Sequence, residues 1–88
     1  MLLCLSTSGS SPNVVAAARA ARACGAEAWA LTGPGPNPLA DASDEAVTVD
    51  CPSTATIQEL HQVAIHLLCG AVDREVALRD GAWQEVHA

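Results

Sequence analysis

The sequence contains no lysine, and this absence limits what the chain can bind. Its positive side chains are four arginines, against ten acidic residues, which gives a formal net charge of −6 at pH 7. Binding to nucleic acid or to an anionic membrane relies on clustered lysine and arginine. We therefore expect neither as a partner, and a small anion would have to be held by backbone amides, hydroxyl groups and a helix terminus.

Aromatic side chains are nearly absent as well. The chain of 88 residues has no phenylalanine or tyrosine, and its aromatic side chains are Trp29 and Trp83. Half of the residues are hydrophobic, and much of that share is alanine. A core of alanine, valine and leucine favours helices packed closely against a sheet. Because so short a chain buries a modest core, we expect one small domain or part of a larger one.

The sequence also lacks a C-x-x-C motif and a long apolar run. Its cysteines are scattered, so zinc-ribbon and thioredoxin patterns do not fit. Cys4 and Cys69 lie within apolar stretches, which predicts small buried thiols in a reducing, cytoplasmic compartment. The N-terminal segment has no basic region and only a short apolar run, so we expect neither a signal peptide nor a membrane span.

Short apolar runs alternate with helical patterns along the chain. The runs at 2–5, 28–31 and 46–49 are typical of strands buried in a parallel sheet. Between them, helical stretches are expected from residue 12 and at 39–42, and a long helix from about 55 to about 78. Strands that alternate with helices predict an α/β fold with a parallel sheet.

Residues at the helix ends support these boundaries. Ser11 is a suitable N-cap, Pro12 suits the first helical position, and Gly25 is well placed to end that helix. Ser53 or Thr54 is expected to cap the long helix. The predicted apolar side of the long helix consists of Ile57, Leu60, Ala64, Leu67 and Leu68.

The most informative segment is the small polar loop at 6–11, between the first strand and the first helix. Ligands of open α/β sheets lie beyond the carboxyl ends of the strands, and a helix N-terminus there presents free N–H groups to an anion. Gly9 permits close approach of the backbone, and the loop is rich in hydroxyl groups. An ordinary capped turn uses the same residue types, so the local sequence leaves both interpretations open. The loop is neither a Walker A motif nor a dinucleotide-binding loop.

Four segments together resemble a known family. The sequence STSGSSPNV at 6–14 resembles the phosphate loop of sugar-isomerase (SIS) domains, and ALTG at 30–33 resembles the strand end that follows it. PLA at 38–40 with SD at 43–44 resembles the short turn of that family. IQELH at 57–61, followed by His66, resembles the last helix of phosphoheptose isomerases. The matches occur in order over nearly the whole chain.

This resemblance implies a fold and a reaction. The fold would be a three-layer, SIS-like α/β sheet related to flavodoxin and Rossmann folds, with residues 1–79 as the C-terminal part of the domain and 80–88 as a tail. The reaction would be isomerisation of sedoheptulose 7-phosphate to D-glycero-D-manno-heptose 7-phosphate. Family members carry a further N-terminal half with other active-site groups, so we expect the chain to be incomplete. They form homotetramers, and zinc occurs in some of them.

The resemblance also assigns roles to single residues. His66 would be the catalytic acid/base residue, and Gln58 with His66 would match metal contacts of the family. The residues expected to bind phosphate and substrate are Ser6, Thr7, Ser8, Ser11 and Gln58. A neutral imidazole suits proton transfer between adjacent carbons. Gln58 and His66 are about 12 Å apart along a helix, which is long for joint ligation of one ion.

Several alternatives stay open. A non-catalytic sugar-phosphate sensor is one, and an interaction module like the relatives that bind the replication initiator is another; His66 favours the isomerase. Without the resemblance, His66 would be read as a histidine satisfied by a backbone partner. His61, about 140° from His66 around the helix, is expected at the surface or at a subunit contact. A partial sheet leaves apolar surface uncovered, so we expect a fragment or an obligate oligomer.

Overall fold

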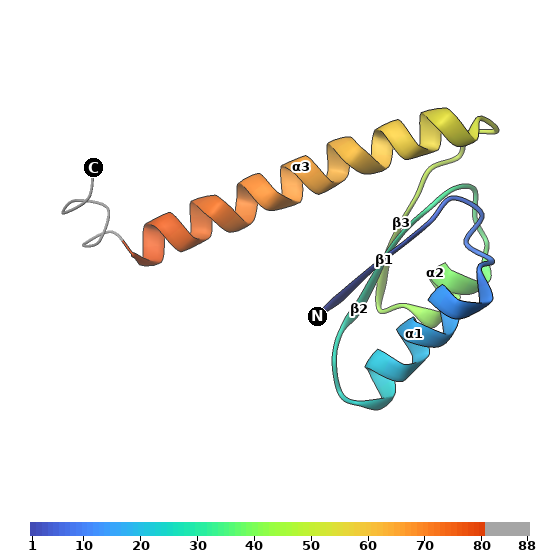
Figure 1. Cartoon of the computed structure of the whole chain (residues 1–88), viewed down its shortest axis with the longest axis horizontal. Coiled ribbons are helices and arrows are strands. Elements are labelled where there is room, and N and C mark those ends of the chain that lie inside the picture. The colour runs from blue at the N-terminus through green and yellow to red at the C-terminus, as the bar shows by residue number, and fades with distance from the viewer. Residues whose placement is uncertain (81–88) are drawn as a thin grey trace.

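The computed structural model describes residues 1–80 (Figure 1). Its strands are β1 (Leu2–Ser6), β2 (Ala28–Thr32) and β3 (Glu45–Thr48), and its helices are α1 (Pro12–Ala23), α2 (Pro38–Ala42) and α3 (Thr54–Arg79). The strands pair in parallel in the order β1-β2-β3. α1 and α2 lie on one side of the sheet and α3 on the other (Figure 1). The predicted α/β class and parallel sheet are confirmed; Trp83, His87 and most of the predicted tail lie outside the described residues.

The core lies between the sheet and the pair α1 and α2. Alternate residues of a strand face opposite sides, so Cys4, Ala28 and Ala30 turn toward these helices. They pack with Val15, Ala18, Leu39 and Ala42 in one buried cluster. Ala18, Ala28 and Leu39 are completely buried, because small side chains let the helices approach the sheet closely. Burial raises the pKa of the Cys4 thiol.

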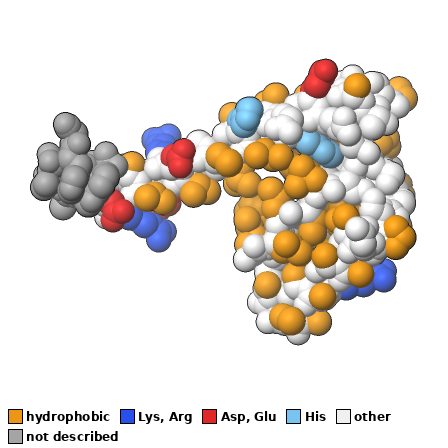
Figure 2. Space-filling view, in the orientation of Figure 1, with side chains coloured by type: hydrophobic (Ala, Val, Ile, Leu, Met, Phe, Trp, Pro, Cys, Tyr) orange, Lys and Arg blue, Asp and Glu red, His pale blue; other side chains and the backbone are white. Residues whose placement is uncertain are grey.

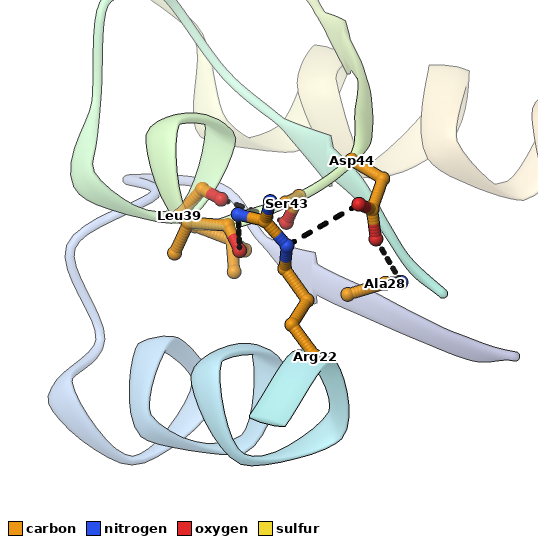
Figure 3. Close-up of polar contacts among 6 residues, drawn as sticks. Arg22, Ala28, Leu39, Ser43 and Asp44 are labelled. Carbon is orange, nitrogen blue, oxygen red and sulfur yellow. Dashed lines mark hydrogen bonds and ion pairs between the residues drawn. The ribbon is translucent and has the colours of Figure 1, made fainter. Parts of the chain in front are cut away.

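Polar contacts tie the elements together at the end of the sheet where β2 begins (Figure 3). Arg22 Nε lies 3.2 Å from Asp44 Oδ1, which joins the last turn of α1 to the turn after α2. Asp44 Oδ2 accepts a 2.8 Å hydrogen bond from the Ala28 amide, and the Asp44 amide donates one of 2.8 Å to the Ala28 carbonyl. Ser43 Oγ donates to the Leu39 carbonyl at 2.8 Å. The loop at 6–11 follows β1 at the opposite end of the sheet, where the strands finish.

The long helix α3 differs from its prediction in the side that it buries. Ile57 is 3% exposed, and Ala64 and Leu68 line the groove between α3 and the sheet. Leu60 and Leu67, which were assigned to the same apolar side, are 45% and 71% exposed. At about 100° per residue these leucines lie roughly 60–80° around the axis from Ile57, outside the stripe that meets the sheet.

The far part of α3 extends beyond the sheet (Figure 1). Cys69 is therefore exposed, and the prediction of a buried thiol is wrong at this position. Apolar side chains remain visible along α3 and in the hollow beneath it (Figure 2). The indole nitrogen of Trp29, at that hollow, is buried without a hydrogen-bond partner among residues 1–80. No helix in the described part of the chain is sufficiently long and apolar to span a membrane.

Candidate functional site

A cavity of about 450 Å³ opens beyond the carboxyl end of β1. It lies between the loop at 6–11 and the N-terminal turns of α3, which contribute one wall each. Its described lining residues are Leu5, Ser6, Thr7, Ser11, Gln58, His61 and Gln62. Among these residues there is no lysine, arginine or carboxylate, so hydroxyl groups, amides and one imidazole set the chemistry of the cavity. The structure thus brings four predicted binding residues together, Ser6, Thr7, Ser11 and Gln58.

The loop is held in shape by its own hydroxyl groups. Ser6 Oγ accepts a 3.0 Å hydrogen bond from the Gly9 amide and lies 3.1 Å from Ser11 Oγ and 3.4 Å from Ser8 Oγ. Ser8 Oγ in turn accepts a 3.1 Å bond from the Ser10 amide. Ser8 is exposed and does not line the cavity, so its observed contacts are with its loop neighbours. Hydrogen bonds among the loop's own residues therefore define its shape.

The neighbouring β2–α2 segment fixes the loop from behind. The Gly33 amide donates to the Thr7 carbonyl and the Leu39 amide donates to the Gly9 carbonyl, both at 2.9 Å. Gly9 has a φ of +67°, and a side chain there would overlap Asn37. These backbone bonds run between segments far apart in the sequence, and they hold Thr7 and Gly9 in place against the β2–α2 segment.

Asn37 is a residue of this framework that the sequence interpretation missed. Its Oδ1 accepts a 2.8 Å bond from the Ala40 amide and caps α2, while its Nδ2 donates to Thr32 Oγ1 at 2.9 Å. Asn directly before Pro38 was the available signal, because asparagine favours the N-cap and proline the first helical position. Its link to Thr32 depends on tertiary packing.

The start of α1 supplies amides that the helix itself does not use. Ser11 occupies the N-cap position as predicted, but its hydroxyl makes no capping bond and lies next to Ser6 Oγ instead. Within α1, the Val15 amide bonds to the Ser11 carbonyl. The amides of Asn13 and Val14 precede this bond, so they have no intrahelical acceptor, and Pro12 has no N–H. This uncapped end, with its positive dipole, suits an anion.

His61 corrects one prediction. It is 4% exposed, not at the surface, and its Nε2 lies 2.9 Å from the Thr32 carbonyl oxygen. The reason is its position four residues after Ile57, about 40° around α3, which turns it toward the sheet. The stripe Ile57, His61, Ala64 and Leu68 was visible in the sequence, but a histidine within it was not read as buried.

His66 lies elsewhere. It follows Ile57 by nine residues, about 180° around α3, and it is exposed. It lines a separate hollow along α3 with Gly70 and Arg74, so the structure does not bring it to the cavity that holds Gln58. No group of three or more His, Cys, Asp or Glu residues suited to a metal occurs within residues 1–80. Zinc prefers such ligands, so these residues do not make a zinc site by themselves.

No family model matches the sequence. The phosphoheptose isomerase of Streptomyces coelicolor is 58% identical over 73 residues, which cover 83% of this chain and 32% of the relative. That of Nitratidesulfovibrio vulgaris is 48% identical over 73 residues, covering 83% of this chain and 35% of the relative. The chain is a partial homologue of the phosphoheptose isomerases. It spans about a third of the length of these curated relatives, and the predicted resemblance is confirmed.

Solved structures agree with this homology. A phosphoheptose isomerase from Francisella tularensis superposes with a TM-score of 0.77 at 33% identity, over 83% of this chain and 41% of its own. The fold of this chain is therefore the one predicted, and it corresponds to less than half of the Francisella protein. The NanR protein of Vibrio vulnificus, solved with ManNAc-6P, has a TM-score of 0.61 at 22% identity and shares the fold.

Proposed function

We propose that this chain is the phosphosugar-binding part of a phosphoheptose isomerase, acting on sedoheptulose 7-phosphate to give D-glycero-D-manno-heptose 7-phosphate. One observation carries the proposal: loop hydroxyls and Ser11, the N-cap residue of α1, line a single cavity whose described lining residues include no lysine, arginine or carboxylate. The identity of 58% to a phosphoheptose isomerase supports the choice of substrate.

The two walls of the cavity bind different ends of the ligand, the phosphate and the sugar. Ser6, Thr7 and Ser11 donate to the phosphate oxygens together with the free amides of α1, which compensates for the absence of lysine. Gln58 and Gln62 on the opposite wall have carboxamide groups that both donate and accept, as sugar hydroxyls require. Ser8 acts indirectly: its hydroxyl lies 3.4 Å from Ser6 Oγ and helps to orient that hydroxyl toward the phosphate.

Isomerisation moves a proton between adjacent carbons, and the resemblance gives that step to His66. His66 does not line the cavity that contains Gln58. We therefore propose that His66 acts in the complete enzyme, at a site that additional residues or a second copy of the chain complete. Zinc has no complete ligand set within residues 1–80, and no step here depends on it. The exposed free thiols of Cys24 and Cys69 fit a reducing location, and we propose the cytoplasm.

A binding titration tests the phosphate loop. Wild-type protein should bind sedoheptulose 7-phosphate in isothermal titration calorimetry, and the double variant Ser6→Ala, Ser8→Ala should bind at least about a hundredfold more weakly, because several hydrogen bonds to a charged group are lost. Ser10→Ala is the matched control, since Ser10 is an exposed loop serine outside the cavity lining. Equal affinity in wild type and double variant would contradict the assignment.

Conversion to the aldose phosphate, followed by NMR, is the second readout of that experiment. In an assembly that turns over substrate, His66→Ala should lose conversion and keep its affinity within about twofold, since His66 does not line the phosphate cavity. The serine double variant should lose both properties. Loss of binding in His66→Ala would show that the separation of the two roles is wrong.

A sugar-phosphate sensor is the second candidate, favoured by the position of His66. A chain whose cavity holds no histidine other than His61 among its described lining residues has the parts for binding without turnover. Tight binding combined with no conversion in any assembly would identify the sensor.

We also propose self-association, as a homotetramer, through the exposed stripe of α3. Leu60, Val63 and Leu67 are 45%, 55% and 71% exposed on neighbouring turns, and such contiguous apolar surface marks an interface. Sedimentation velocity should show an oligomer for wild type and mostly monomer for Leu60→Glu, Leu67→Glu. Asp73→Asn, an exposed change about 80° around α3 from Val63, should leave the oligomer intact. A monomeric wild type at micromolar concentration would contradict the proposal.

A further inference from the structure

The ring of His61 has a defined arrangement of donor and acceptor. Its Nε2 lies 2.9 Å from the carbonyl oxygen of Thr32, and a carbonyl oxygen only accepts hydrogen bonds. Nε2 therefore carries the proton. In the neutral ring, Nδ1 is then a hydrogen-bond acceptor.

A buried framework holds this ring in place. Thr32 is completely buried, and its carbonyl also accepts a 3.1 Å bond from the Val49 amide. Its hydroxyl accepts from Asn37, the residue that packs against Gly9 of the phosphate loop. The loop and the His61 ring are thus attached to the same rigid segment, so the distance between the phosphate site and the imidazole is fixed by the fold.

The other groups of the cavity make this acceptor distinctive. In the proposed function Ser6, Thr7 and Ser11 serve as donors to the phosphate. Gln58 and Gln62 are exposed, whereas His61 is buried. No carboxylate is found among the described lining residues. His61 is therefore the buried, oriented acceptor that the cavity offers to a hydroxyl hydrogen.

We propose that His61 is a substrate-binding residue whose Nδ1 accepts a hydrogen bond from a hydroxyl group on the carbon chain of the bound phosphosugar. The inference rests on the proposed function and deepens it, because it gives the cavity a way to distinguish a sugar phosphate from inorganic phosphate. The phosphate end is recognised by the loop, and the polyol end is oriented by an imidazole that sequence comparison did not select.

Two ligands and one conservative variant test it. In His61→Gln the amide nitrogen still donates to the Thr32 carbonyl, but the ring acceptor is gone. Calorimetry should show affinity for sedoheptulose 7-phosphate reduced about tenfold, the effect of one net hydrogen bond, and affinity for inorganic phosphate unchanged within about twofold. An equal loss for both ligands would mean that His61 only supports the fold, and no loss for either would mean that it does not touch the sugar; both results overturn the inference.

A measurement on the wild-type protein avoids any folding defect in the variant. With ¹⁵N-labelled imidazole groups, NMR should show the Nε2-protonated tautomer of His61, and sedoheptulose 7-phosphate should shift its Nδ1 resonance while inorganic phosphate leaves it in place. An unmoved Nδ1 signal on saturation with the sugar phosphate overturns the inference alone. If wild type binds neither ligand, the proposed function fails as well, so the two failures are distinguishable.

Discussion

Gly33→Ala should lower the free energy of unfolding by about 2–4 kcal/mol and abolish phosphosugar binding, the sum of overpacking and a lost buried hydrogen bond. A methyl group at Gly33 would overlap the carbonyl oxygen of Thr7 and lie 2.9 Å from Ile57 Cδ1. The Thr7 carbonyl is the acceptor of the Gly33 amide, so the phosphate loop must move away from β2. The contact with Ile57 is at the flexible end of that side chain, which can shift, so the loop is the wall of the cavity that is displaced.

Urea unfolding and the calorimetric titration measure these effects. The matched control is Gly70→Ala, because Gly70 lies inside α3 and, beyond the adjacent backbone of that helix, no described atom lies within 4 Å of an added methyl group. Alanine favours a helix interior over glycine by up to about 1 kcal/mol, so this variant should be slightly more stable and bind normally. Wild-type affinity in Gly33→Ala would show that the loop position does not depend on the β2 end.

Leu39→Ala should cost about 2–5 kcal/mol of stability, the range for truncation of a fully buried leucine. Leu39 is completely buried on α2, where it packs with the small residues of the core such as Ala18 and Ala30. Because these alanines cannot extend into the space, a cavity remains. A small domain has little stability to spare, so this one change should unfold a large fraction of the chain.

The control for this core variant is Leu67→Ala, which removes the same atoms from a side chain that is 71% exposed. Its free energy of unfolding, measured in urea at a concentration where the chain is monomeric, should stay within about 0.5 kcal/mol of the wild-type value. If the two leucine variants lost similar stability, the Leu67 side chain would have to be buried in the folded monomer, contrary to its exposure in the structure.

The fold was largely predictable because its signals are local. Apolar runs of four or five residues, a polar loop after the first run and a proline at the helix start each depend on near neighbours in the sequence. They located β1, β2, α1 and the loop at 6–11, and the order of elements gave the parallel sheet. The resemblance to phosphoheptose isomerases, now supported by 58% identity, depended on the same segments.

The site was predictable only in part, because the sequence did not show which of two histidines on α3 faces the sheet and which faces outward. His61 was expected at the surface and lies buried against Thr32, whereas His66, expected at the catalytic centre, lies on the outward side of α3. Their spacing is visible in the sequence, but which side of an amphipathic helix meets the sheet depends on packing. Ile57 and Leu68 face the sheet, and His61 lies on the same side of α3.

The sequence by itself determined which groups the loop at 6–11 offers, namely hydroxyl groups and backbone amides, because it places serines and no basic residue between a strand and a helix. It also determined the α/β class, through the alternation of short strands with helices. Only the tertiary structure decided the direction in which the loop faces and which imidazole reaches it. Those depend on bonds between distant segments, from Gly33 to Thr7 and from His61 to Thr32, which form when the sheet brings their strand ends together.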